Sequence, residues 1–275
     1  MDVRLLSGAL GADVQGVDLK DSSEKNFKVI NNLLLEHKVI FFRNQNITTE
    51  EQIALAKRFG PLEKHIYVKG REKYPEIVRI IKGPNEKHQW GETWHTDVSY
   101  NVKPTKVIIL RSIKVPPVGG DTMFSNMEIA WDMLDEKIKN KIKSKKALHS
   151  SLGAASFVDK YEKMKGNGNT EEYSNTHPMV RTHPETGKKI LYVNSMYTKK
   201  ILDMDEKESS QILKNIFEHQ ERLDFTCRFR WSENAVAIWD NRSVLHQGLT
   251  DFFPGKGLGH ERIMDRIAIE GDCPN

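Results

Sequence analysis

The feature that most constrains this chain is a pair of potential metal ligands that lies far from a third one. His95 and Asp97 are separated by a single residue, while His246 stands near the C-terminal end of the sequence. On a β-strand, side chains two residues apart project from the same face. A histidine and a carboxylate presented together form two thirds of the two-histidine, one-carboxylate triad that leaves positions open on non-haem Fe(II). We therefore predict that early and late strands enclose these ligands, as in a barrel or a double-layered jelly roll.

Each member of this set also has a simpler explanation. A His-x-Asp pair on a surface strand is commonly just solvated, and a lone histidine such as His246 often caps a loop by hydrogen bonding. In favour of a ligand role, His246 follows an apolar run at residues 235–239, which we interpret as a buried strand that leads into a polar turn. A ligand presented from a strand end has the rigidity that a metal site requires.

The composition argues against several classes of function. The 275 residues include 42 basic and 38 acidic side chains, and the formal net charge of +4 gives no reason to expect nucleic-acid binding. No apolar run approaches the roughly 20 residues needed to cross a bilayer, and the N-terminus lacks the pattern of a secretory signal. Only two cysteines occur, so a disulfide framework is not expected. We predict a cytoplasmic protein that binds neither nucleic acid nor a membrane.

Hydrophobic periodicity predicts an α+β fold in one domain that spans residues 1–275. Apolar spacing and capping residues predict helices over residues 23–34, 48–60, 129–142 and 206–223. Short apolar or alternating runs predict a hairpin between residues 179 and 193 and strands at residues 39–42, 77–81, 107–110, 226–231, 235–239 and 262–269. No GxGxxG or GxxxxGK[ST] motif is present, which argues against a nucleotide-binding α/β fold.

One polar segment is unusually long for a connection in a compact domain. Residues 155–176 contain few apolar side chains and have a Gly/Asn-rich stretch at 166–169. A segment of this length is usually either functional or flexible. We therefore expect either a lid over the site or a flexible insertion.

Two arginines near the C-terminus suggest an anion site. Arg262 and Arg266 are four residues apart, and on a strand this even spacing places both on one face. A dicarboxylic 2-oxo acid bound to iron carries a second, distal carboxylate, and guanidinium can hold a carboxylate through two hydrogen bonds. The alternative is a pair of exposed charges on an edge strand.

Several short motifs occur in a fixed order along the chain. They are WHTDVSY at residues 94–100, GGDT at 119–122, WDNR at 239–242 followed by His246, and RIMDR at 262–266. Together they resemble the Fe(II)/2-oxoglutarate dioxygenases of the taurine dioxygenase and 2,4-dichlorophenoxyacetate dioxygenase family. Each motif is unspecific alone, but their number and order extend the resemblance over almost the whole chain.

The resemblance implies a catalytic centre in which His95, Asp97 and His246 bind Fe(II). It implies that Thr122 and Arg262 hold the distal carboxylate of the cosubstrate 2-oxoglutarate, which reacts with O2 to give succinate and CO2. Because Asp97 is a carboxylate rather than a small residue, the resemblance favours hydroxylation over halogenation.

The resemblance also implies the substrate contacts and the architecture. Arg266 matches the arginine that binds the anionic group of the substrate, and His65 matches a histidine that contacts the same group. Family members fold as a double-stranded β-helix, or jelly roll, with helical insertions, and many are homo-oligomers, either dimers or tetramers.

The chain departs from the family pattern at two places. The connection between His246 and Arg262 is 15 residues long and glycine-rich, which predicts a longer loop than usual. Trp90 and Gly91 stand where taurine-specific members have acidic and amide side chains, so we expect an apolar or bulkier substrate body. Trp90 and Tyr100 are candidates for lining the substrate pocket, with plain core packing as the alternative.

The sequence leaves the identity of the substrate open. The first hypothesis is hydroxylation of a small organic anion such as a sulfonate. The second is the same chemistry on a carboxylic or aryloxyalkanoic acid. A third hypothesis, from a different class, is a β-barrel that binds a small anion without turnover.

Overall fold

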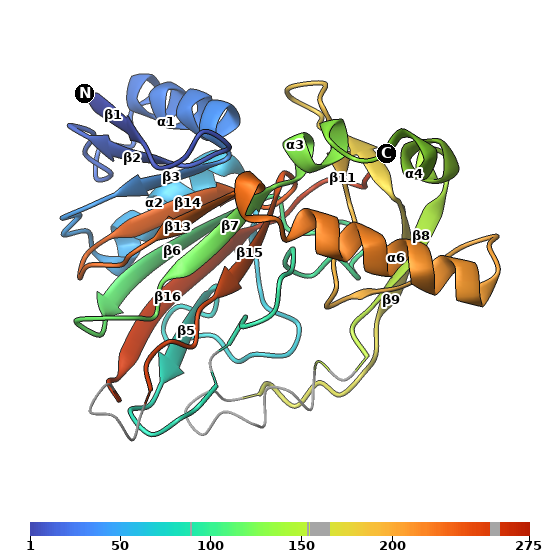
Figure 1. Ribbon diagram of the computed structural model, residues 1–275. Helices are drawn as coiled ribbons and strands as arrows, with labels where there is room; N and C mark the ends of the chain where they lie inside the picture. Colours follow the sequence, from blue (N-terminus) through green and yellow to red (C-terminus); the bar gives the residue numbers. More distant parts are fainter. Residues whose placement is uncertain (89, 153, 155–165, 254–258) are drawn as a thin grey trace.

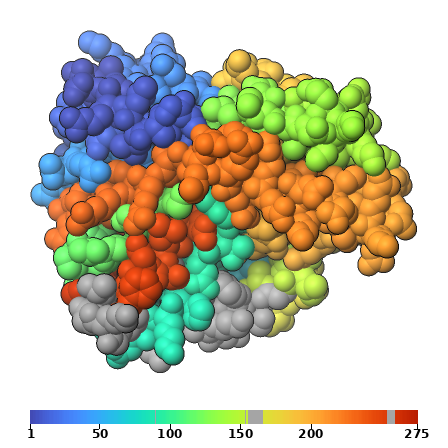
Figure 2. All heavy atoms as spheres, viewed as in Figure 1, coloured from blue at the N-terminus to red at the C-terminus, as the bar shows by residue number. Residues whose placement is uncertain are grey.

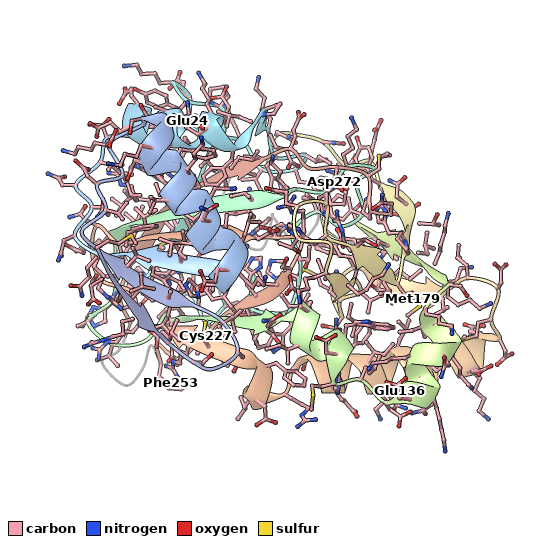
Figure 3. All side chains as sticks on the ribbon, turned by 90° about the horizontal axis from the view of Figure 1, so that it is seen from above. Glu24, Glu136, Met179, Cys227, Phe253 and Asp272 are labelled. Carbon is pink, nitrogen blue, oxygen red and sulfur yellow. The ribbon has the colours of Figure 1, made fainter. Side chains whose placement is uncertain are left out.

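Strand β3 (Val39–Phe42) shows how the main sheet is packed. All four of its side chains are buried. The even-numbered ones belong to an apolar cluster under helices α1 (Glu24–His37) and α2 (Thr49–Phe59), and the odd-numbered ones belong to a second cluster on the opposite face. Because successive strand residues point to opposite faces, a strand that is apolar at every position must be covered on both. Figure 3 shows α1, which starts at the labelled Glu24, lying across the strands.

The main sheet has eight strands in the order β1-β2-β3-β14-β6-β16-β4, and β5 also pairs with β16. Its strands besides β3 are β1 (Asp2–Leu5), β2 (Ala12–Gln15), β4 (Leu62–Glu63), β5 (Ile77–Lys82), β6 (Val107–Lys114), β14 (Val236–Asp240) and β16 (Arg262–Ile269). The pair β2–β3 is parallel, whereas β14 and β16 pair antiparallel with their neighbours. The late strands β14 and β16 therefore lie between strands from the first half of the chain (Figure 1). The wide separation of the metal-ligand candidates in the sequence predicted such an arrangement.

A second sheet packs on the inner face of the main sheet. It consists of β7 (Thr122–Asn126) between β13 (Thr226–Phe229) and β15 (Val244–Gly248). The ring of Phe41 in the main sheet stacks on Phe229 with centroids 3.9 Å apart. This aromatic packing fixes the distance between the sheets on either side of the inner apolar cluster.

The remaining elements form a helical side with its own apolar cluster (Figure 1). They are α3 (Met127–Asp132), α4 (Glu136–Ile142), α6 (Glu206–Gln220), the short 3-10 helix η1 (Leu223–Phe225), the sheet β12-β8-β9 (Thr198–Ile201, Lys146–Ser150, Ser174–Pro178) and the hairpin β10-β11 (Val180–Thr182, Lys189–Leu191). Figure 2 shows this division on one face of the molecule, where the N-terminal residues (blue) and the α6 region (orange) occupy different ends.

The computed structural model describes residues 1–88, 90–152, 154, 166–253 and 259–275. Over this part of the chain the α+β class is confirmed, as are the β10-β11 hairpin and the capping box of Thr48 and Glu51 at the start of α2. The same residues include no helix with the length and apolar character needed to cross a membrane.

The single helix predicted over residues 129–142 is wrong. The structure has two helices, α3 and α4, because Asp135 caps a new helix by accepting hydrogen bonds from the backbone N–H groups of Lys137 and Ile138. Met133, expected on the buried face, lies at the break and is 61% exposed. A local capping residue has overridden the apolar periodicity here.

Candidate active site

His95, Asp97 and His246 converge in the interior of the protein. Each offers one ligand atom, and these three atoms all lie within 4.8 Å of one another. Nε2 of His95 is 3.4 Å from Oδ1 of Asp97, and Nε2 of His246 is 3.8 Å from Oδ2 of the same carboxylate. All three side chains are buried, so their polar atoms face one another rather than bulk water.

Backbone pairing brings the two histidines together. The N–H of His95 donates to the carbonyl of His246 at 3.1 Å, and the N–H of His246 donates to the carbonyl of His95 at 2.8 Å. His246 lies in the middle of β15, not at a strand end, whereas His95 makes this single bridge outside any strand. The chain then turns at Asp97 instead of continuing as the extended strand that the His-x-Asp spacing suggested.

The turn after Asp97 contains a strained residue. Val98 has φ of 46°, a left-handed conformation that is unfavourable for a β-branched side chain. The buried side chain of Asn241 accepts from the N–H of Asp97 at 3.1 Å and donates to its carbonyl at 3.3 Å. Asn241 also donates to the carbonyl of Thr105 at 2.8 Å. This asparagine therefore holds the backbone of Asp97 against the strain next to it.

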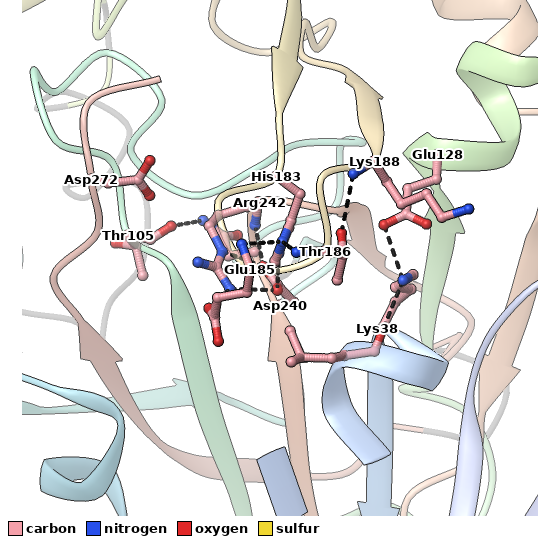
Figure 4. Close-up of polar contacts among 12 residues, drawn as sticks. Lys38, Thr105, Glu128, His183, Glu185, Thr186, Lys188, Asp240, Arg242 and Asp272 are labelled. Atoms are coloured by element: carbon pink, nitrogen blue, oxygen red, sulfur yellow. Dashed lines mark hydrogen bonds and ion pairs between the residues drawn. The ribbon is translucent and has the colours of Figure 1, made fainter. Parts of the chain in front are cut away.

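The residues on either side of the Asn241 turn are fixed as well. Arg242 donates through Nε to one carboxylate oxygen of Asp240 and through Nη2 to the other, and His183 shares the second oxygen (Figure 4). Glu185 accepts a further hydrogen bond from Arg242. This buried network supports the turn that joins β14 to β15.

The polar surroundings of the three side chains suit a divalent metal ion. Nδ1 of His95 lies 2.6 Å from the carbonyl of Thr93, which can only accept, so Nδ1 is a donor and Nε2 is the nitrogen that faces Asp97. Burial and the neighbouring His95 lower the pKa of His246 to about 3, so this imidazole is neutral. Burial alone would raise the pKa of Asp97, but Arg266 and the two histidines hold it well below its usual range. Two imidazoles and one carboxylate are the donor set expected for Fe(II).

Arg262 and Thr122 lie in a cavity of about 50 Å³ beside the three ligands. The Arg262 side chain is 6% exposed, and within the described ranges it makes no hydrogen bond or ion pair, with Nε buried and unpartnered. Burial lowers its pKa to about 10, so the guanidinium remains charged near neutral pH. A buried cation without a partner is costly, and a ligand carboxylate would remove this cost. The cavity therefore fits the distal carboxylate of 2-oxoglutarate.

The glycines before Thr122 are required by the backbone. Gly120 has φ of 73°, and a Cβ atom at this position would lie 2.6 Å from the ring of Phe252. Phe252 belongs to the long connection between His246 and Arg262, of which residues 254–258 lie outside the described part. The ring is 1% exposed, so the described part of this connection packs against the GGDT motif.

A larger cavity of about 200 Å³ adjoins the first one, and both are lined by His95, Trp90 and Gly91. The predicted residues His65, Trp90 and Tyr100 all line it. Most of the other lining side chains are also apolar or aromatic, namely Tyr67, Leu152, Met196 and Tyr197. No lysine or arginine lines this cavity among the described residues.

His65 enters the larger cavity as a neutral hydrogen-bond donor. The backbone N–H groups of Tyr67 and Val68 both donate to its Nδ1, each at 3.1 Å, so Nδ1 must be the unprotonated nitrogen. Burial and the charge of Arg266 lower the pKa of His65 to about 3. The proton is therefore on Nε2, which can donate to an oxygen of a bound anion.

Arg266 does not line the larger cavity, where we expect the substrate, but lines the smaller one. Its side chain lines the smaller cavity together with Arg262, so the even spacing does place both arginines on one side of β16. Its Nη2 donates to Oδ2 of Asp97 at 3.1 Å. The partner of Arg266 in this structure is therefore a metal-ligand candidate.

The predicted lid at residues 155–176 is only partly within the described residues, since residues 155–165 lie outside them. The part that follows is tied to the wall of the larger cavity. The N–H of Asn167 donates to the carbonyl of Tyr67 at 2.9 Å, and the hydroxyl of Tyr67 donates to the carbonyl of Glu171 at 2.8 Å.

Sequence reasoning missed several residues at the site. Tyr67, Met196 and Tyr197 line the larger cavity, and Asn241 holds Asp97. Asn241 stands inside the WDNR motif, and this motif marked the segment as part of the site. The sequence did not indicate that the side chain of Asn241 contacts Asp97. The contribution of Met196 and Tyr197 depends on how the segment after the hairpin packs, which no local pattern encodes.

Comparison with known proteins agrees with this geometry. The model of the family described as taurine catabolism dioxygenase TauD, TfdA family, matches residues 2–267. The chain is 33% identical to an alkylsulfatase of Acinetobacter baylyi, over 99% of this chain and 86% of that protein. It is 30% identical to an alpha-ketoglutarate-dependent sulfate ester dioxygenase of Pseudomonas putida, over 100% and 91% of the two chains.

A solved structure extends the likeness to three dimensions. A putative alpha-ketoglutarate-dependent taurine dioxygenase from Burkholderia xenovorans superposes with a TM-score of 0.85 at 32% identity, covering 99% of this chain and 93% of the other. A family match over nearly the whole sequence and relatives above 30% identity lead to one conclusion: the chain belongs to the TauD/TfdA family of dioxygenases.

Proposed function

We propose that this protein is an Fe(II)- and 2-oxoglutarate-dependent dioxygenase that hydroxylates a small organic anion such as a sulfonate and releases succinate and CO2. The observation that carries this proposal is the buried convergence of His95, Asp97 and His246 beside an arginine that lacks an ion-pair partner among the described residues. Membership of the TauD/TfdA family supports the same reaction.

The three converging side chains would hold the metal through Nε2 of His95, Nε2 of His246 and a carboxylate oxygen of Asp97. When bound, iron together with 2-oxoglutarate and O2 supplies the oxidative chemistry that no side chain can perform. The protein contributes the neutral imidazole of His246, the ionised carboxylate of Asp97 and a buried setting that excludes bulk water.

Thr122 and Arg262 would bind the distal carboxylate of the cosubstrate. The guanidinium supplies the charge, and the hydroxyl supplies a further donor on the wall of the same small cavity. Because both side chains stand on strands, at the start of β7 and the start of β16, the carboxylate would be held on rigid backbone.

The larger cavity would hold the primary substrate. Nε2–H of His65 would donate to an oxygen of its anionic group, and Arg266 would supply the opposite charge from the neighbouring cavity. Trp90 and Tyr100 would contact the substrate body. The similarity to an alkylsulfatase and to a sulfate ester dioxygenase supports an anion that contains sulfur.

A second candidate is the same chemistry on a carboxylic or aryloxyalkanoic acid. The observation that favours it is the aromatic lining of the larger cavity, where Tyr67, Trp90, Tyr100 and Tyr197 surround the space available to the substrate. Aromatic rings pack well against an aryl group, and they add little for a small polar body.

The architectural predictions belong to the same proposal. The main sheet and the sheet β13-β7-β15 would form the two halves of a double-stranded β-helix, within one domain that spans residues 1–275. The described part of the predicted lid at residues 155–176 would cover the larger cavity, which the ties of Asn167 and Glu171 to Tyr67 support. We further propose a cytoplasmic homo-oligomer, a dimer or a tetramer.

The test is a screen for succinate formation. Purified protein is supplied with Fe(II), 2-oxoglutarate and O2, and sulfonates, sulfate esters, aryloxyalkanoic acids and other small acids are compared for succinate formed per substrate consumed. We expect a one-to-one ratio with the true substrate class and no turnover by Asp97→Ala. A protein that binds these anions but forms no succinate with any of them would be the non-catalytic anion-binding barrel instead.

A further inference from the structure

Trp231 contacts both residues of the proposed carboxylate site. Its indole Nε1 donates to Oγ1 of Thr122 at 3.0 Å, and the guanidinium carbon of Arg262 lies 5.8 Å from the centroid of its ring. The side chain is 5% exposed and packs edge-on against Phe229 at 5.0 Å, which holds the ring in place. Trp231 thus links the two residues from behind the small cavity.

The hydrogen bond from Trp231 determines what Thr122 can do. An indole N–H only donates, so the threonine oxygen must be the acceptor in this contact. Within the described part of the chain, this is the one hydrogen bond that involves Oγ1 of Thr122. The hydroxyl hydrogen is therefore left for another acceptor, and a carboxylate is a group that only accepts. Accepting one hydrogen bond also strengthens the next one donated by the same hydroxyl.

The face of the same ring stabilises Arg262 without competing for it. A guanidinium near an aromatic face is favoured by the ring quadrupole, and the effect grows when the cation is shielded from water. A protein carboxylate in this place would occupy the hydrogen-bonding groups of Arg262. The indole leaves these groups available for a ligand.

We propose that Trp231 is a positioning residue that makes the site select 2-oxo acids with a second, distal carboxylate. It does so by presenting Thr122 as a donor and by keeping Arg262 in place. This inference rests on the proposed function, because it presupposes that a 2-oxo acid binds beside the metal.

The test compares two 2-oxo acids that differ at one end. 2-Oxoglutarate carries the distal carboxylate, whereas 2-oxopentanoate has a methyl group in its place. Binding of each acid to the Mn(II)-loaded protein without oxygen is measured by calorimetry. Trp231→Phe keeps an aromatic ring and removes the donor. We expect it to weaken 2-oxoglutarate binding about three- to ten-fold, the loss typical of one hydrogen bond between neutral groups, and to leave 2-oxopentanoate binding within about two-fold.

Three further variants sharpen the result. In the Thr122→Val background, Trp231→Phe is expected to change 2-oxoglutarate binding very little, because the partner of the indole is gone. Trp131→Phe, on helix α3 in the other apolar cluster, is the matched control and is expected to bind both acids as the wild type does. Placing 3-benzothienylalanine at position 231 replaces the N–H by sulfur in a ring of the same shape, so it tests the donor even if Trp231→Phe does not fold.

The outcomes separate the two levels of the proposal. The role of Trp231 is overturned if the phenylalanine and benzothienyl variants bind both acids equally more weakly than the wild type. It is also overturned if these variants bind both acids as tightly as the wild type. A wild type that shows no preference for 2-oxoglutarate over 2-oxopentanoate overturns the proposed cosubstrate as well. A wild type with that preference, together with variants that keep it in full, overturns this inference alone.

Discussion

Nη2 of Arg266 donates a hydrogen bond to Oδ2 of Asp97 across 3.1 Å, and both side chains are buried. This contact joins the residue proposed to bind the substrate anion to one of the proposed metal ligands. A guanidinium has five N–H groups, so Arg266 can keep this bond while other N–H groups reach toward the larger cavity. The substrate anion and the metal-ligand carboxylate would then share one cation.

Arg266→Ala is expected to weaken the binding of the primary substrate far more than that of 2-oxoglutarate. Loss of a charge-assisted hydrogen bond of about 1.5–3 kcal/mol predicts a KM for the substrate that rises about 10- to 100-fold. The two KM values are measured by succinate release. Arg262→Ala serves as the counterpart, with the opposite pattern expected. Equal weakening of both ligands by Arg266→Ala would reject the substrate role of this residue.

His95→Ala is expected to abolish stoichiometric metal binding at micromolar protein concentrations. A triad that loses one of its three protein ligands binds the ion weakly, and Mn(II) binding followed by calorimetry or electron paramagnetic resonance measures the loss. His88→Ala is the matched control, because His88 is an exposed histidine close by in sequence that pairs with Glu92. Undiminished metal binding by His95→Ala would contradict the assignment of the ligands.

Asn241→Leu is expected to lower metal affinity although Asn241 is not itself a ligand candidate. The variant leaves the N–H of Asp97 and the carbonyl of Thr105 without their side-chain partner, at a cost of about 1–3 kcal/mol for each unsatisfied buried group. Because Val98 next to Asp97 is strained, the freed turn should relax and move the carboxylate. Metal affinity that stays at the wild-type value while the melting temperature falls would show a purely structural role.

The Asp240 network is expected to make the fold sensitive to acid. Burial alone would raise the pKa of Asp240, but the charge of Arg242 and the hydrogen bonds from Arg242 and His183 hold it well below its usual range. The folded protein therefore binds fewer protons here than the unfolded chain does. The stability that this group contributes is complete above its ordinary pKa of about 4 and is lost as the pH falls below that value.

The measurement for this network is urea unfolding at a series of pH values. Asp240→Asn is expected to lower the free energy of unfolding at neutral pH by about 3–5 kcal/mol, since it breaks a buried ion pair, and to flatten the loss of stability in acid. Asp224→Asn is the control, because Asp224 pairs with Arg222 on the surface. A wild-type acid profile in Asp240→Asn would place the acid sensitivity elsewhere.

Trp90→Ala is expected to discriminate between the two candidate substrate classes. Removing this aromatic wall should cost a substrate with an aryl or long alkyl body about 1.5–3 kcal/mol, or roughly 10- to 100-fold in KM. A small sulfonate that does not reach the wall should lose much less. The comparison uses both substrate types with each protein, and a uniform loss would show that Trp90 only supports the cavity.

Structural features that depend on residues close together in the sequence were the easiest to predict. The capping box of Thr48 and Glu51 and the β10-β11 hairpin are set by neighbouring residues, and both are confirmed. The break at Asp135 is local too, but the apolar spacing of Ile129, Ile138 and Ile142 concealed it. The capping residue Asp135 was a better guide here than the apolar periodicity.

At the candidate site, contacts between segments that are remote in sequence could not be predicted. The metal-ligand candidates and Arg262 were proposed from residue chemistry and spacing, and the family motifs then supported the roles proposed for them. The contacts of Trp231 with Thr122 and of Asn241 with Asp97 join segments that are remote in sequence, and neither depends on a repeating pattern. Such contacts are settled by how the sheets pack, so they become visible only in three dimensions.

The backbone bridge between His95 and His246 also bears on how the protein matures. During synthesis, His95 leaves the ribosome long before His246, so the growing chain cannot assemble a complete ion-binding centre until β15 has emerged and docked. In the proposed centre, uptake of the ion would therefore follow the docking of β15. An ion present at about a thousand times its dissociation constant would stabilise the folded state by about 4 kcal/mol, which would protect newly made molecules from unfolding.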